Sequence, residues 1–211
     1  MLTVKDTYNQ IGVQFSASRG YIWPDLRPFL AAVAPSSTVL DVGCGNGRLL
    51  LGLPEQIEYT GLDFSTSLLK KALENHPQVR FIEADITEPD AWTDLPQFEY
   101  IFCIAVIHHL ANRREQLFLL KQIKKHLQPD GRYLLTAWNL WQPKILKHHL
   151  SPQSLNLKYK MKNLKYLAIP FQNHLRFHFA HTKPYLEGLL REAGFENFKI
   201  EKTSRNYLIH N

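Results

Sequence analysis

The chain of 211 residues is poor in cysteine and has no long apolar run. Its two cysteines, Cys44 and Cys103, are too few for a disulfide framework or a cysteine-built zinc site. No stretch of about 18 apolar residues is present, and the N-terminus lacks the apolar segment of a secretory signal, so we expect neither a membrane span nor export. These absences favour a protein of the reducing cytoplasm.

Acidic residues are missing from one long segment, residues 131–186, which holds nine Lys or Arg and five of the ten His. The rest of the chain carries 16 basic and 19 acidic residues, so the net charge of +6 arises in this segment alone. Such asymmetry is typical of a surface that faces a polyanion, and a solvated basic loop explains the charge equally well.

Short apolar runs alternate with helical patterns through the middle of the chain, which is typical of βαβ units. The pattern predicts an α/β fold with a doubly wound, mostly parallel sheet of seven strands, the last one antiparallel, and helices on both faces. A turn at 129–131 should separate the helix from the fifth strand, because Pro-Asp-Gly has turn chemistry. We predict strands at 38–42, 58–62, 79–84, 98–104, 132–138, 195–203 and 206–210, and helices at 48–53, 65–75, 113–127 and 184–193.

The N-terminal residues have helical spacing but precede the first strand. Tyr8, Ile11 and Phe15 share one helical face, and Pro24 and Pro28 bracket the start of a second helix that continues through Ala34. We expect one domain over 1–211, with an N-terminal helical cover at 1–35 and a basic insertion at about 141–182.

A glycine-rich turn, DVGCGNG at 41–47, follows the first predicted strand. Its G-x-G-x-G spacing differs from the G-x-G-x-x-G of dinucleotide binders, and we find no hydride-handling pocket for NAD. Asp63 ends the second strand and Asp85 the third, so with Asp41 three carboxylates come to successive strand ends. Ligands of doubly wound sheets bind at this edge, which predicts a nucleoside site there. A glycine turn with incidental acids is the structural alternative.

Four segments in this order carry a family resemblance: VLDVGCGNG, YTGLDFS, FIEADI and LQPDGRYLLTAWN. Over residues 36–140 the chain resembles the class I S-adenosylmethionine-dependent methyltransferases, which have a Rossmann-like fold. The resemblance implies that the glycines pass the methionine part of the cofactor, that Asp63 holds the ribose and that Asp85 contacts the adenine amine. The implied cofactor residues are Asp41, Gly43, Cys44, Gly45, Asn46, Gly47, Asp63, Phe64, Ser65, Asp85, Ile86, Ile104, Ala105 and Val106.

A narrower resemblance spans nearly the whole chain. The segments YNQI at 8–11, FSASR at 15–19, AVIHHL at 105–110 and RFHFAHT at 176–182 are similar to the tRNA wobble-uridine methyltransferases. That family methylates the carboxylate of 5-carboxymethyluridine in the anticodon loop, and its eukaryotic members work with a small zinc-containing activator subunit. Residues 144–166 match no motif of the family. The resemblance implies tRNA as a partner and leaves the oligomeric state open.

A carboxylate acceptor is already ionised at neutral pH, so it needs a clamp and no general base. Residues for that clamp are Arg19, His108, His109, Arg176 and His178, with Tyr21 and Trp138 to stack a base and Lys158, Lys160 and Lys162 to contact phosphates. Arg19 is equally suited to the cofactor carboxylate or to a structural ion pair. We expect no metal, because no carboxylate or cysteine stands at ligand-like spacing from the paired histidines.

Two other functions fit the same motifs. In the first, a small-molecule methyltransferase acts on a metabolite and the basic insertion is only a lid. In the second, the domain binds S-adenosylmethionine as a ligand without catalysis.

Overall fold

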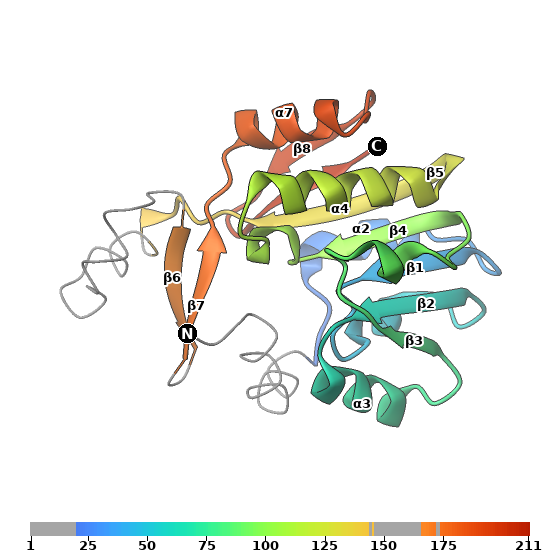
Figure 1. Ribbon diagram of the computed structural model, residues 1–211. Coiled ribbons are helices and arrows are strands. Elements are labelled where there is room, and N and C mark those ends of the chain that lie inside the picture. The colour runs from blue at the N-terminus through green and yellow to red at the C-terminus, as the bar shows by residue number, and fades with distance from the viewer. Residues whose placement is uncertain (1–19, 144, 146–165, 172–173) are drawn as a thin grey trace.

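Seven strands form the central sheet in the order β3-β2-β1-β4-β5-β9-β8 (Figure 1). The computed structural model describes residues 20–143, 145, 166–171 and 174–211. Strands β1 to β5 pair in parallel, whereas β9 is antiparallel to both of its neighbours, which confirms the predicted sheet. The strands are β1 Thr38–Val42, β2 Glu58–Asp63, β3 Arg80–Glu83, β4 Phe98–Ile104, β5 Leu127–Trp138, β8 Lys199–Lys202 and β9 Asn206–His210.

Helices cover both faces of this sheet. One face carries α4 and α7, the other carries η1, α2 and η2, and α3 lies beside β3 (Figure 1). Among the described residues, no helix has the length and apolar character that crossing a membrane requires. The α-helices are α2 Arg27–Ala31, α3 Thr66–Asn75, α4 Arg113–His126 and α7 Lys183–Glu192, and the short 3-10 helices are η1 Pro24–Leu26, η2 Arg48–Gly52, η3 Pro89–Trp92 and η4 Ile107–His109.

The central strands are apolar at nearly every position because both of their faces are buried. On β4, Ile101 and Cys103 pack with the cluster under α4 and α7. Phe102 and Ile104, whose side chains alternate with them, pack on the opposite face with Leu26 of η1. The strand order reverses between β1 and β4, so a crevice opens at the carboxyl ends of these two strands.

The predicted turn at 129–131 is wrong, because those residues lie inside β5. Phe98 of β4 pairs with Leu127, and Tyr100 pairs with Arg132, so residues 128–131 form a bulge opposite Glu99. A Cβ on Gly131 would come within 2.9 Å of the Leu127 side chain. The glycine therefore permits close packing within the bulge, and the strand continues through the residues that were predicted to form a turn.

A two-stranded hairpin that was not predicted lies in the basic insertion and is formed by β6 (Tyr166–Phe171) and β7 (His174–Phe179). Leu167 pairs with His178 and Ile169 with Arg176, so these four side chains share one face. Leu167 joins a small buried cluster with Leu140, which anchors the hairpin beside the end of β5 (Figure 1).

Of the predicted N-terminal cover, the part that is described packs on the sheet through Trp23, Leu26 and Leu30. The helical face of Tyr8, Ile11 and Phe15 lies outside the described residues.

Candidate active site

A cavity of about 460 Å³ opens at the carboxyl edge of the sheet, where the strand order reverses. Twelve of the predicted cofactor residues line it. They are Asp41, Gly43, Cys44, Gly45, Asn46, Asp63, Phe64, Asp85, Ile86, Ile104, Ala105 and Val106. Gly47 and Ser65 do not belong to this lining. Gly47 precedes η2 and packs toward Phe81, while Ser65 is the N-cap of α3 and accepts from Leu68 N at 3.4 Å.

The first glycine of the loop is required for two reasons. Gly43 has a φ of +75°, and a Cβ there would lie 2.3 Å from Cγ2 of Val106. Val106 is brought over the glycine by Ala105, which has a φ of +61°. The amide of Ala105 donates to Thr136 Oγ1 at 2.8 Å, which helps to hold this conformation. A non-glycine residue with positive φ is strained, and here the strain lies on the cavity wall.

Asp63 fastens the glycine loop to the end of β2. Its Oδ2 accepts from Gly45 N and its Oδ1 accepts from Ser65 N, both at 2.8 Å. Burial raises the pKa of Asp63 to about 6, although these backbone hydrogen bonds lower it. Each oxygen keeps a lone pair, so the carboxylate can still accept from a diol in the cavity.

Asp41 lies one strand away and is held from inside the core. The hydroxyl of Tyr59 donates to Asp41 Oδ2 at 2.7 Å. Burial raises the pKa of Asp41 to about 7, while the Tyr59 hydrogen bond and the charge of Arg48 lower it. Arg48, which also lines the cavity, lies 4.5 Å above the ring of Trp23. Both Tyr59 and Arg48 were missed, although Arg48 directly follows the glycine loop.

Asp85 differs from the other two acids because it is exposed. One of its oxygens, Oδ1, accepts from the amide of Thr87 at 3.0 Å and from its hydroxyl at 2.7 Å. These bonds orient the carboxylate beside Ile86 at the rim of the cavity.

Four aromatic rings meet where η4, the end of β5 and β7 come together; we call His108, His109, Trp138 and His178 the ring cluster. Trp138 stacks on His108 at 4.7 Å and on His178 at 5.0 Å between ring centroids. His109 lies 4.5 Å from His108 and 4.7 Å from His178. His109 and Trp138 also line the cavity, so the cluster is continuous with it.

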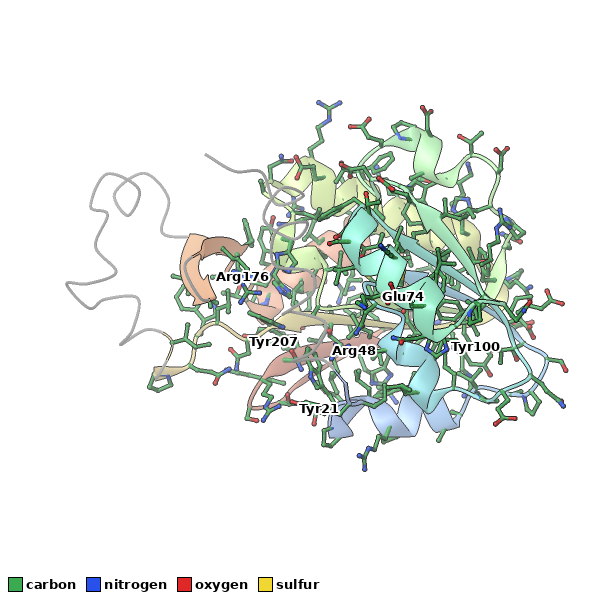
Figure 2. All side chains as sticks on the ribbon, turned by 90° about the horizontal axis from the view of Figure 1, so that it is seen from below. Tyr21, Arg48, Glu74, Tyr100, Arg176 and Tyr207 are labelled. Carbon is green, nitrogen blue, oxygen red and sulfur yellow. The ribbon has the colours of Figure 1, made fainter. Side chains whose placement is uncertain are left out.

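Arg176 completes this basic group. Its guanidinium lies 5.8 Å from the centre of the Trp138 ring, and its side chain on β7 (Figure 2) is buried, as is that of His178. The three histidines and Arg176 were predicted for the substrate clamp and Trp138 for base stacking, but only the fold shows that segments about 70 residues apart meet.

The three histidines bring one ring nitrogen each within 4.8 Å of the others, a grouping that could hold a metal ion. The expectation of no metal was based on the sequence neighbours of His108 and His109, whereas His178 lies 70 residues from His108 in the sequence. The tautomer of His108 argues against ligation by Nε2, because its Nδ1 accepts from Trp138 N at 3.4 Å and the proton of the neutral ring is then on Nε2. The absence of a metal stays a prediction.

Other predicted substrate residues are placed differently. Tyr21 is 53% exposed and is not part of the cavity lining (Figure 2). Arg19, Lys158, Lys160 and Lys162 lie outside the described residues.

The residues present fit S-adenosylmethionine. A loop without side chains at Gly43 and Gly45 forms one wall, and buried carboxylates at successive strand ends supply acceptors for ammonium and hydroxyl groups. Phe64 and Ile86 add apolar surface to the lining of the cavity. The fold and this cavity define a class I S-adenosylmethionine-dependent methyltransferase.

Known proteins that resemble the chain support the same class of protein. A family described as a methyltransferase domain matches residues 15–200, and the chain belongs to this family. A solved S-adenosylmethionine-dependent methyltransferase from Methanosarcina mazei has a TM-score of 0.68 at 15% identity, covering 90% of this chain and 96% of that one.

Two relatives support the narrower resemblance. The tRNA (carboxymethyluridine(34)-5-O)-methyltransferase of Saccharomyces cerevisiae is 32% identical over 143 residues, which are 66% of this chain and 49% of that protein. The Mus musculus protein of the same name, ALKBH8, is 31% identical over 139 residues, which are 66% of this chain and 20% of that protein. The chain thus spans half or less of these relatives, and the predicted resemblance to this family is confirmed.

Proposed function

We propose that the protein methylates the carboxylate of 5-carboxymethyluridine in the anticodon loop of tRNA and forms the methyl ester. The observation that carries this proposal is the meeting of Arg176, His108 and His178 around Trp138, beside the cavity. A cationic, hydrogen-bonding group next to an aromatic ring suits an anion attached to a base. The names of the relatives point to the same acceptor.

In this proposal the cofactor residues act as the family resemblance implies. Asp41 faces the amino group of S-adenosylmethionine, Asp63 holds the ribose hydroxyls and Asp85 accepts from the adenine amine. Phe64 and Ile86 sandwich the adenine. Ile104, Ala105 and Val106 line the side near the methyl group, next to the ring cluster.

S-adenosylmethionine, when bound, supplies an electrophilic methyl group. The residues that line the cavity would hold this cofactor so that its methyl carbon could pass to a carboxylate oxygen, with the electron pair of the broken carbon–sulfur bond left on sulfur. The chain's own task is to remove water from the oxygen and to align it. A neutral donor suits the reacting oxygen, because a full positive charge there would reduce its nucleophilicity. His108 meets this requirement, since burial holds its pKa well below the usual range.

The wider RNA contact is part of the same proposal. Trp138 offers a partly exposed ring on which a flipped-out base can stack, and Lys158, Lys160 and Lys162 would contact phosphates. We place the protein in the cytoplasm with tRNA. A small activator subunit stays an expectation from the resemblance.

The test is incubation with methyl-labelled S-adenosylmethionine and either total RNA or extracted metabolites, followed by mild alkali. We expect label in RNA that is released as methanol, because an ester hydrolyses whereas N- and C-methyl groups survive. Label only in metabolites would favour a small-molecule methyltransferase. Binding of the cofactor without any S-adenosylhomocysteine would indicate a non-catalytic protein.

A further inference from the structure

The hydrogen-bonding pattern of His178 is fixed by its own strand. Its Nδ1 lies 3.1 Å from the carbonyl oxygen of Arg176. A carbonyl only accepts, so Nδ1 carries the proton and the neutral ring has a lone pair on Nε2. That Nε2 atom is buried and has no hydrogen-bond partner among the described residues.

His108 has the opposite pattern. The amide of Trp138 can only donate, so the contact at 3.4 Å makes Nδ1 of His108 the acceptor and leaves the proton on Nε2. This Nε2–H is also buried without a partner among the described residues. Buried polar atoms are rarely left unpaired, and two of opposite sense beside a cavity-lining ring indicate a ligand that pairs with them.

The surroundings keep His178 neutral in the free protein. Burial lowers its pKa well below the usual value, and the charges of His109 from η4 and Arg176 from β7 lower it further. His108 lies 5.2 Å from it, and His181, whose pKa burial lowers to about 3, follows on the same segment. A bound acidic ligand would instead favour the protonated form of His178, because the ligand would place a negative charge against four imidazoles and one guanidinium.

We infer that His178 takes up one proton when the carboxylate acceptor binds against the ring cluster, and that the resulting imidazolium holds, through Nε2–H, the carboxylate oxygen that does not react. This inference rests on the proposed function. A carboxylate has only acceptor sites, so the lone pair of neutral His178 would repel it, whereas a protonated ring donates at Nε2 and keeps its Nδ1–H bond to Arg176.

The proton is expected to leave after methyl transfer. The carboxylate and the sulfonium lose their opposite charges together, as a neutral ester and a neutral thioether form. The imidazolium of His178 then faces no anion and remains beside Arg176, so its proton is released to solvent and the hold on the product weakens. Binding and release of the RNA are thereby linked to one proton.

Calorimetry can count this proton. The protein, loaded with S-adenosylhomocysteine, is titrated at pH 7.5 with an anticodon stem-loop RNA that contains 5-carboxymethyluridine, in phosphate and in Tris buffer. Because the two buffers differ in ionisation enthalpy, the difference in heat gives the protons taken up per RNA bound. We expect a value approaching one for the acid RNA and near zero for the same RNA as its methyl ester.

Two variants assign the proton. His178→Gln should bind the acid RNA more weakly and with almost no proton uptake. His210→Gln is the matched control, because His210 pairs with Glu201 on β8 at 3.2 Å, away from the ring cluster, and it should keep the full uptake.

Four outcomes would overturn the inference. They are binding of the acid RNA by the wild-type protein without a buffer-dependent heat, equal uptake with acid and ester RNA, uptake that persists in His178→Gln, and binding that requires a divalent metal and is lost with EDTA. In each of these the proposed function still stands. Absence of any binding to the modified RNA would instead reject the proposed function itself.

Discussion

The hydroxyl of Tyr59 on β2 donates a 2.7 Å hydrogen bond to Asp41 on the neighbouring strand, and it does so from inside the core. Tyr59 is buried and its edge packs against Phe81, so the hydroxyl position is fixed by apolar contacts. Asp41 is the acid nearest the start of the glycine loop. Asp41, which lines the cavity, is thus oriented by Tyr59, which does not line it.

Replacement of Tyr59 by Phe tests this relationship. The lost hydrogen bond stabilised the ionised form of Asp41, so the pKa of Asp41, already near 7, should rise further. Less ionised carboxylate would then be present at pH 7 to pair with the ammonium of the cofactor. We expect S-adenosylmethionine affinity to fall about 5-fold, as loss of about 1 kcal/mol implies, and to recover between pH 7 and 8.

Isothermal calorimetry with S-adenosylhomocysteine over pH 6.5–8 measures this effect directly. Tyr100→Phe is a suitable control, because the Tyr100 hydroxyl bonds the carbonyl of Ala32 away from the cavity. A Tyr59→Phe protein with unchanged affinity at every pH would show that the hydroxyl does not position Asp41.

Stability should depend on pH through the same carboxylate. Asp41 titrates near 7 when folded and near 3.8 in its ordinary state, so the folded protein retains a proton that the unfolded chain has lost between these values. Its contribution therefore destabilises the fold as pH rises from about 4 to 7, by on the order of 4 kcal/mol. Asp63, with a folded pKa of about 6, acts in the same direction.

Buried histidines change the free energy of unfolding with pH in the opposite direction, so the effect of Asp41 has to be measured as a difference between a variant and the wild-type protein. The lowered pKa values of His108 and His178 mean that their contribution is lost as pH falls below about 6.5. Urea unfolding of Asp41→Asn and wild-type protein at pH 5 and pH 8 cancels this background. We expect the variant to gain stability relative to wild type at pH 8, and an equal difference at both pH values would contradict the assignment.

Replacement of Gly43 by Ala should damage both fold and binding. The residue must keep a φ of +75°, and the new methyl would meet Val106 Cγ2 at 2.3 Å. We expect a loss of about 1–3 kcal/mol in unfolding free energy and no measurable cofactor binding. Gly188→Ala is the control, because a Cβ there meets no atom within 4 Å and α7 favours alanine. Calorimetry and urea unfolding of both variants measure the two effects.

Local chemistry explains what the sequence could predict. A helix was predicted at 65–75, and Ser65 caps α3 there, since a cap depends on residues three positions away. Strand β4 was predicted at its observed bounds because its run of apolar residues is buried on both faces. The carboxylates at strand ends follow from the parallel order, which places every carboxyl end at one edge.

Long-range packing explains what the sequence could not predict. The hairpin of β6 and β7 contains Pro170, and a proline within a segment argues against a strand. The hairpin is stabilised by packing against Leu140 and Trp138, which the sequence does not reveal. Tyr59 read as an ordinary core residue of β2, because nothing nearby in sequence marks its hydroxyl. The bulge at 128–131 likewise depends on the partner strand, whereas its residues alone have turn chemistry.

The basic segment gives the last prediction, a salt dependence of RNA binding. If Lys158, Lys160 and Lys162 contact three phosphates, replacement of all three by Gln should lower the slope of log K against log salt by about 2, since each phosphate contact on single-stranded RNA contributes roughly 0.7. Affinity for tRNA would fall at low salt, while S-adenosylhomocysteine affinity would not change, because the proposed cofactor site is built from the glycine loop and the strand ends. Filter binding from 50 to 300 mM salt measures the slope.

Substitution of Lys121, Lys124 and Lys125 on α4 removes the same charge elsewhere and should leave the slope unaltered. Equal slopes for wild type and the Lys158, Lys160 and Lys162 variant would assign these lysines to solvent, and the acceptor RNA would then be held by the ring cluster and Arg176 alone.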